Sequence, residues 1–205
     1  MKLAVFVSGK GTNLLNIRKK HEEGFLKSEV VLVVSNRECD AVADSRKAGI
    51  VTAVIDPRSF HDEEAFAGAL IEVLLRNEIE FIVLAGYLAK VPEKVVSLFE
   101  NKIINIHPAL LPAFGGKGMY GMKVHQAVID YGCKVSGATV HIVDNDYDHG
   151  AVVLQKCIQL EEDETTESLA RRIHNLEYEL LPSAIRLFEE NKLEIRGRKV
   201  RVIQN

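Results

Sequence analysis

The strongest constraint on the fold is a repeated alternation of short apolar runs with longer amphipathic stretches. Largely apolar runs stand at residues 3–7, 30–34, 51–55 and 81–84, and a helix-like pattern follows each of them. Strands buried on both faces read as continuous apolar runs. Strands that alternate with helices form parallel sheets. We therefore predict an α/β fold with a Rossmann-like, doubly wound, mostly parallel sheet.

The second half of the chain departs from this alternation. Strand-like stretches at 136–143 and 151–160 flank an acidic turn at 144–150, which predicts antiparallel strands. A long amphipathic helix interrupted at Pro182 is expected over 165–191, after a solvated acidic run at 161–164, and a small hairpin closes residues 193–203. We expect a single domain over 1–205, with a phosphate- or nucleotide-binding half at 1–100 and a catalytic half at 101–205.

The composition argues against several classes of protein. A net charge of -3 gives no reason to expect nucleic acid or an anionic membrane as the main partner. The cysteines at 39, 133 and 157 are widely spaced and form no CxxC, which argues against disulfides and zinc and favours a cytoplasmic protein. No apolar run is long enough to span a bilayer.

A glycine turn follows the first predicted strand. Residues 8–13 read Ser-Gly-Lys-Gly-Thr-Asn and lead into a helix, so the free amides of Gly11, Thr12 and Asn13 suit a phosphate. Leu14 stands where the dinucleotide fingerprint needs its third glycine, so a phosphate monoester fits better than NAD or ATP. The alternative is a structural glycine turn with Thr12 as the N-cap.

Asn105 and His107 stand where a buried strand must end. The run 102–104 leads into them, and Pro108 and Pro112 then prevent a central strand from continuing. Ligands bind at the carboxyl ends of parallel strands, so these residues should share a crevice with Gly11 and residues 84–86. Alternatively, Asn105 caps a turn and His107 fills a hydrogen-bonded slot in the core.

Asp148, in the acidic turn, is the natural partner for His107. A carboxylate stabilises the imidazolium form, and a neighbouring Asn donor suits a reaction that develops an oxyanion and moves a proton. Acyl or formyl transfer to an amine fits this description, and no Ser or Cys has the context of a nucleophile, which indicates direct transfer. A metal site built from His107, His125, His141, His149 and Asp148 matches no ligand spacing, so no metal is predicted.

Taken together, these motifs resemble the phosphoribosylglycinamide formyltransferases, part of the folate-dependent formyltransferase superfamily, over nearly the whole chain. The stretches that carry the resemblance are residues 8–14, 34–36, 84–87, 105–112 and 137–150. The resemblance implies transfer of a formyl group from 10-formyltetrahydrofolate, a cosubstrate, to the amine of glycinamide ribonucleotide in de novo purine biosynthesis. It further implies small-molecule partners only, a monomer or homodimer, and a folate-binding second half.

The resemblance also assigns residues. It implies catalysis by Asn105, a protonated His107 and Asp148, and substrate binding by Gly11, Thr12, Asn13, His174 and Glu177. The residues that it implies for folate binding are Leu84, Tyr87, Leu88, Val91, Val96, His141, Val143 and Asp144.

The sequence departs from the family pattern at three places. Ala89 and Lys90 stand where a basic and then an apolar residue are usual. The loop 113–121 is long and rich in glycine, as a lid would be, and His149 replaces a small residue and is expected to face solvent.

Three other functions fit part of the pattern. A 10-formyltetrahydrofolate hydrolase would use the same trio on water but usually carries an extra N-terminal domain. Other N-formyltransferases, acting on sugar nucleotides or methionyl-tRNA, bring a further C-terminal domain. A non-catalytic, phosphate-binding Rossmann module would explain Gly9 and Gly11 and would leave Asn105, His107 and Asp148 apart from one another.

Overall fold

The structure, a computed structural model, describes residues 1–203. The helices are α1 (Thr12–Glu22), α2 (Asp40–Lys47), the short 3-10 helix η1 (Pro57–Ser59), α3 (Glu63–Arg76), α4 (Glu93–Leu98), α5 (Met122–Asp130) and α6 (Thr166–Glu189). The strands are β1 (Lys2–Val7), β2 (Glu29–Ser35), β3 (Val51–Val54), β4 (Phe81–Leu84), β5 (Ile103–His107), β6 (Val135–Ile142), β7 (Val152–Gln159), β8 (Leu193–Arg196) and β9 (Lys199–Val202).

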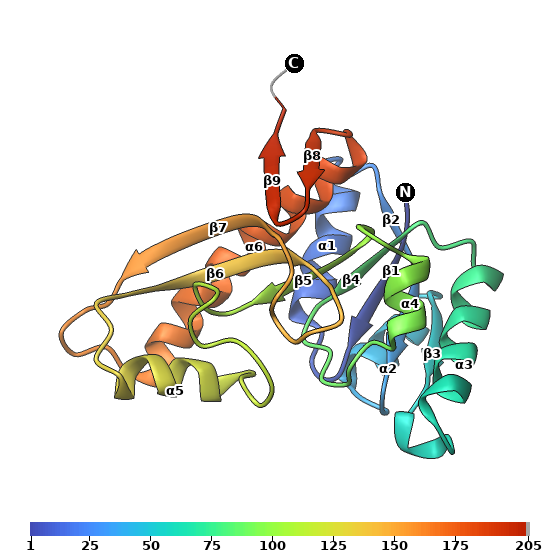
Figure 1. Cartoon of the computed structure of the whole chain (residues 1–205), viewed down its shortest axis with the longest axis horizontal. Helices are drawn as coiled ribbons and strands as arrows, with labels where there is room; N and C mark the ends of the chain where they lie inside the picture. The colour runs from blue at the N-terminus through green and yellow to red at the C-terminus, as the bar shows by residue number, and fades with distance from the viewer. Residues whose placement is uncertain (204–205) are drawn as a thin grey trace. The chain divides into compact units, whose positions relative to one another are not determined.

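The strands form a seven-stranded sheet and a separate hairpin. The order in the larger sheet is β3-β2-β1-β4-β5-β6-β7. β1 pairs in parallel with β2 and β4, β2 pairs in parallel with β3, and β6 and β7 are antiparallel. The predicted α/β fold, a mostly parallel sheet with antiparallel strands in the second half, is therefore confirmed (Figure 1). The chain divides into two compact units, Met1–Ile104 and Asn105–Asn205.

In the first unit, β1 lies inside the sheet, between β2 and β4. Leu3 through Val7 are completely buried, as a continuous apolar run predicts. α2 packs on β2 and β3, and α3 packs on α4. The side chain of Asp62 accepts a hydrogen bond from the backbone N–H of Ala65 and so fixes the start of α3.

The first helix is capped by Gly11, which corrects the reading of Thr12 as the N-cap. Gly11 adopts a left-handed conformation with φ of 70°, and Thr12 is already the first helical residue. A Cβ atom at Gly11 would lie 2.5 Å from the Cβ of Ala41, so no larger residue fits without movement. The glycine is required by backbone conformation and by close packing together.

In the second unit, α6 packs along β6 and β7, and α5 packs on α6. A capping box between Thr165 and Ser168 starts α6. The helix then runs unbroken to Glu189 with Pro182 inside it, so the predicted interruption at Pro182 is wrong. Proline removes one backbone hydrogen bond, but it is buried on the apolar face of the helix, and that burial keeps the helix continuous.

The end of the chain forms the predicted small hairpin, in which β8 and β9 are antiparallel. Just before α6, the acidic run is not wholly solvated, because the side chain of Glu164 is only 4% exposed and pairs with Arg172. None of the helices within residues 1–203 combines the length and the apolar character that crossing a bilayer requires.

The backbone that follows β5 is held by Thr139 of β6, which is completely buried. Its hydroxyl donates a hydrogen bond to the carbonyl oxygen of Ala109 at 2.6 Å and accepts one from the N–H of Leu111 at 3.1 Å. It also accepts a bond from Nε2 of Gln155 at 2.8 Å, so the single donor and both lone pairs are used. Thr139 therefore fixes the backbone of residues 109–111, which follow β5.

We predict that Thr139→Val destabilises the protein by about 2–4 kcal/mol, because it leaves a buried N–H and a buried carbonyl without partners. Thr139→Ser keeps the hydroxyl and should cost clearly less. Urea unfolding followed by circular dichroism measures both variants, and equal losses would contradict the role assigned to the hydroxyl.

Candidate active site

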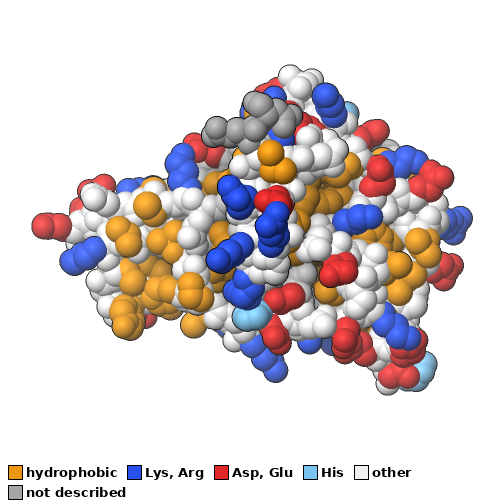
Figure 2. Space-filling model, turned by 45° about the horizontal axis from the view of Figure 1, so that its top comes forward, with side chains coloured by type: hydrophobic (Ala, Val, Ile, Leu, Met, Phe, Trp, Pro, Cys, Tyr) orange, Lys and Arg blue, Asp and Glu red, His pale blue; other side chains and the backbone are white. Residues whose placement is uncertain are grey.

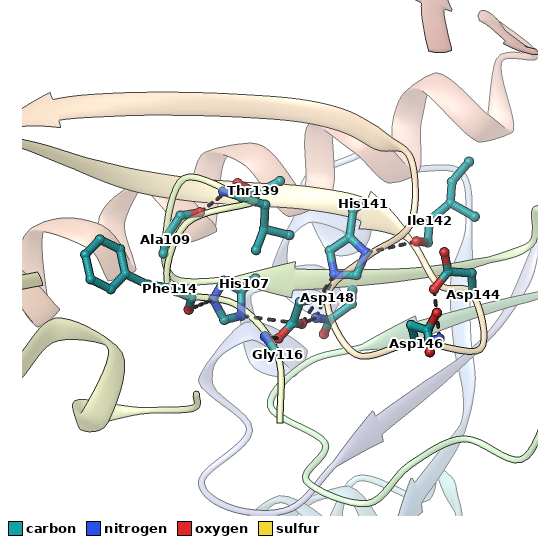
Figure 3. Close-up of polar contacts among 12 residues, drawn as sticks. His107, Ala109, Phe114, Gly116, Thr139, His141, Ile142, Asp144, Asp146 and Asp148 are labelled. Atoms are coloured by element: carbon teal, nitrogen blue, oxygen red, sulfur yellow. Dashed lines mark hydrogen bonds and ion pairs between the residues drawn. The ribbon is translucent and has the colours of Figure 1, made fainter. Parts of the chain in front are cut away.

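Three polar side chains of the second unit converge on the carboxylate of a fourth residue, Asp148. Asn105 and His107 come from β5, His141 from β6 and Asp148 from the loop that follows β6. Oδ1 of Asp148 lies 3.3 Å from Nδ2 of Asn105, 3.5 Å from Nδ1 of His107 and 3.6 Å from Nε2 of His141. Figure 3 shows the rings of His107 and His141 turned toward Asp148. The side chains of both histidines are almost completely buried.

Asp148 is held in an unusual backbone conformation, with φ of 52°. The N–H of Gly116 donates a hydrogen bond to its Oδ2 at 2.9 Å. A Cβ atom at Gly115 would lie 2.6 Å from Cδ2 of Leu111 and 3.1 Å from the Cβ of Asp148. The glycine-rich loop can therefore approach Asp148 this closely because Gly115 has no side chain.

Both ring nitrogens of His107 face acceptors. Nε2 lies 2.8 Å from the carbonyl oxygen of Phe114, and since a carbonyl only accepts, this nitrogen carries a proton. Nδ1 faces the carboxylate of Asp148 at 3.5 Å, which is longer than a charge-assisted hydrogen bond. A second proton on Nδ1 would therefore find an acceptor already in place.

Burial lowers the pKa of His107 below its usual value of 6.5, although the charge of Asp148 and the carbonyl of Phe114 act in the opposite direction. At neutral pH the ring in the free protein is therefore mainly neutral, with its proton on Nε2. The protonated state that the family resemblance implies for His107 stays a prediction, and burial of the ring disfavours that state in the free protein. Desolvation of the buried ring outweighs the attraction of a carboxylate 3.5 Å away.

Asp148 itself remains ionised. Its burial alone would raise its pKa, but His141, His107 and the N–H of Gly116 together bring the pKa below the usual value of 3.8. The site therefore contains a negative charge at neutral pH, to which the N–H of Gly116 and the amide of Asn105 donate hydrogen bonds.

His141 fixes the orientation of the Asn105 amide. Nδ1 of His141 donates to the carbonyl oxygen of Ile142 at 2.9 Å, which leaves Nε2 of the neutral ring as an acceptor. That nitrogen lies 3.1 Å from Nδ2 of Asn105. The amide of Asn105 therefore has two acceptors beside it, Nε2 of His141 and Oδ1 of Asp148. Its NH₂ group must face both of them. The sequence suggested only folate binding for His141.

The other predicted residues of the second unit lie on α6 and at the start of the 144–150 loop. Nδ1 of His174 lies 3.0 Å from Oε2 of Glu177, whose side chain is 10% exposed. Val143 and Asp144 follow β6 directly.

The predicted residues of the first unit lie at the carboxyl ends of β1 and β4. Gly11, Thr12 and Asn13 form the turn into α1, and the N–H of Ala41 donates to the carbonyl oxygen of Gly9 at 3.2 Å. Oγ of Ser8 accepts a bond from the N–H of Leu88 at 2.9 Å, so the two turns are joined. Of the folate candidates in this unit, Leu84 and Val91 are buried, Tyr87 and Val96 are half-buried, and Leu88 is exposed.

Two contacts in the site could not be predicted from the sequence, and backbone groups make both of them. The carbonyl of Phe114 and the N–H of Gly116 contact His107 and Asp148, respectively. A backbone group has no residue-specific signature, and the only available signal was the run of glycines at 115 and 116. His149 is exposed, as expected, and its Nδ1 also lies 2.8 Å from Oδ2 of Asp144. Within residues 1–203, no group of three or more His, Cys, Asp and Glu residues could hold a metal ion.

The chain is similar to known formyl transferases. The family described as Formyl transferase matches residues 1–185. The chloroplastic phosphoribosylglycinamide formyltransferase of Arabidopsis thaliana is 38% identical over all of this chain and 70% of its own length. The phosphoribosylglycinamide formyltransferase of Bacillus subtilis is 37% identical over 90% of this chain and 93% of its own. A solved structure, glycinamide ribonucleotide transformylase 1 from Symbiobacterium toebii, superposes with a TM-score of 0.92 at 37% identity, covering 100% of this chain and 94% of that one.

The state of His107 generates a prediction. We expect nuclear magnetic resonance of ¹⁵N-labelled His107 to give a pKa below 6.5, with Nε2 protonated in the neutral ring. Asp148→Asn should lower that pKa further, because it removes the charge that opposes burial. Since the unfolded chain takes up this proton near 6.5 and the folded chain only at lower pH, His107 should also reduce stability as the pH falls below 6.5. A pKa that rises in Asp148→Asn would contradict this account.

Proposed function

The chain belongs to the formyl transferase family, and from that premise we propose that it transfers a formyl group from 10-formyltetrahydrofolate to the amine of 5'-phosphoribosylglycinamide. The products are formylglycinamide ribonucleotide and tetrahydrofolate, in de novo purine biosynthesis. The family implies a folate-derived formyl donor, and the relatives named above act on this ribonucleotide by name.

The observation that carries the proposal is the convergence of Asn105, His107 and Asp148. Nδ2 of Asn105 and Nδ1 of His107 lie 3.3 and 3.5 Å from the same carboxylate oxygen. A non-catalytic phosphate-binding module predicts that these three side chains lie apart. A formyl transferase needs a donor for an oxyanion and a group that accepts and returns a proton at one place.

We assign the stabilisation of the oxyanion to Asn105. The amine of the ribonucleotide attacks the formyl carbon, and the formyl oxygen gains negative charge as the new C–N bond forms. Both N–H bonds of Asn105 are directed at acceptors, one at His141 and one at Asp148. The contact to Asp148, at 3.3 Å, is the longer one and is the one to be exchanged for the formyl oxygen.

His107 and Asp148 move the proton. The attacking amine must lose a proton, and N10 of the folate must gain one when its bond to the formyl carbon breaks. Nδ1 of neutral His107 receives the amine proton, directly or through water, beside the charged Asp148. The imidazolium formed there stabilises the oxyanion and then returns the proton to N10. A histidine that is neutral at rest fits this sequence better than one that is already charged.

The family resemblance also assigns the residues that bind the two substrates. We assign the ribonucleotide phosphate to the backbone amides of Gly11, Thr12 and Asn13 at the start of α1, because the N-terminus of a helix favours an anion. His174 and Glu177 would bind the ammonium or ribose hydroxyls. The family resemblance assigns folate binding to Leu84, Tyr87, Leu88, Val91, Val96, His141, Val143 and Asp144.

The direct test is the change in folate absorbance when purified protein is mixed with 10-formyltetrahydrofolate, with and without the ribonucleotide. Tetrahydrofolate that appears only with the ribonucleotide is the expected result. Its release in water alone would replace the transferase by a hydrolase, and no release in either mixture would exclude both.

Two variants in the acidic loop test whether Asp148 takes part in the reaction. Asp148→Asn should lower turnover by about two orders of magnitude or more while the fold stays intact, since the amide carries no charge and accepts no proton. Asp146→Asn removes an exposed carboxylate from the same loop and should leave turnover nearly unchanged. Near-normal turnover in Asp148→Asn would remove Asp148 from the mechanism.

A further inference from the structure

A chain of three polar side chains lies next to Asp148 but outside the proposed reacting groups. It runs from Asp144 through His149 to Arg198, which is at the tip of the β8–β9 hairpin. Figure 2 shows lysine and arginine side chains gathered below the grey end of the chain, with a histidine and acidic side chains beside them. The proposed reaction uses neither His149 nor Arg198.

The carboxylate of Asp144 organises the loop from within. Oδ1 accepts a hydrogen bond from the N–H of Asp146 at 3.0 Å, and Oδ2 lies 2.8 Å from Nδ1 of His149. The bond to His149 joins the two ends of the loop. Just beyond it, a Cβ atom at Gly150 would lie 1.8 Å from the carbonyl oxygen of Ile142, so the chain is packed tightly against the end of β6.

Arg198 reaches this loop from a rigid support. Arg196 pairs with Lys199, so the hairpin turn consists of Gly197 and Arg198, and Gly197 has φ of 57°. A two-residue turn with glycine first is a favoured hairpin geometry and holds the next residue in one direction. β9 also packs on β7, which starts where the 144–150 loop ends.

The hydrogen bonds of His149 have a fixed direction. Because Nδ1 donates to the carboxylate of Asp144, Nε2 of the neutral ring is an acceptor. Nη1 of Arg198 lies 3.1 Å from this Nε2 and donates to it. The same Nη1 lies 3.3 Å from Nδ1, so the guanidinium group rests against the ring.

The contact between Arg198 and His149 can affect Asp148 because His149 directly follows Asp148 in the chain. Asp148, the preceding residue, has φ of 52°, a left-handed conformation that residues with a side chain rarely adopt. Such a conformation persists where the surroundings fix it on both sides. Gly116 and Asn105 hold the carboxylate of Asp148, while Asp144 and Arg198 hold the ring of its neighbour on the exposed side of the loop.

We propose that Arg198 is a positioning residue for Asp148. Through His149 it holds the 144–150 loop in the conformation that points the Asp148 carboxylate at Asn105 and His107. This inference rests on the proposed function for its kinetic consequence, and on the geometry of the loop alone for its structural consequence.

The kinetic test compares Arg198→Ala with Arg196→Ala. Arg196 carries the same charge in the same hairpin, but it pairs with Glu194 instead of His149. Arg198→Ala should lower kcat about threefold, the size expected for an exposed polar contact, and leave KM for the ribonucleotide unchanged. Arg198→Lys, which can still donate to Nε2, should recover most of the loss. Equal kcat values for the two alanine variants would overturn the proposal.

A double-mutant cycle shows whether Arg198 acts through His149. Once His149→Ala has removed the ring, adding Arg198→Ala should cause little further loss of kcat. If the two losses simply multiply, Arg198 acts by another route and the proposal is wrong.

The structural test needs no activity. Amide hydrogen exchange of residues 145–150 should become faster in Arg198→Ala but not in Arg196→Ala, while β1 keeps its protection in both. Unchanged exchange in the loop would overturn the proposal. If the wild-type protein transfers no formyl group, the proposed function fails, and the exchange measurement still decides whether Arg198 holds the loop.

Discussion

The carboxylate of Asp148 is the group on which the rest of the site depends. Burying a carboxylate is costly unless donors surround it. Here the N–H of Gly116 and the amide of Asn105 donate to it, and two histidine rings face it. These partners come from different parts of the fold. The end of β5 supplies Asn105 and His107, β6 supplies His141, and the glycine-rich loop supplies a backbone donor that a side chain at Gly115 would displace.

The parts of the fold set by local pattern could be predicted from the sequence. Continuous apolar runs located the buried strands, and β4 has the expected bounds. The site could be located in part for the same reason. The prolines after His107 end β5, and the two-residue period of a strand puts Asn105 and His107 on one face. Asp148 was recognised as a partner from its chemistry and from the family resemblance, because the pattern of one loop does not determine where its side chains lie.

The features that could not be predicted depend on tertiary contacts. Pro182 was expected to interrupt a helix, but burial of the apolar face keeps α6 continuous. His107 was expected to be charged, but its pKa depends on how completely the ring is desolvated, which one sequence does not give. The backbone groups of Phe114 and Gly116, and the contact between His149 and Arg198, join residues distant in sequence and have no signature of their own.

The charge of Asp148 in the folded protein is the most direct test of this account. Nuclear magnetic resonance of ¹³C-labelled aspartate carboxyl carbons would follow the titration of Asp148, with its signal assigned by its loss in Asp148→Asn. The account predicts a pKa below 3.8, so that a buried carboxylate is charged throughout the neutral range and holds Asn105 and His107 in place. A carboxyl group that titrates near neutrality would mean that desolvation outweighs its donors, and that Asp148 cannot organise the site as a charged group.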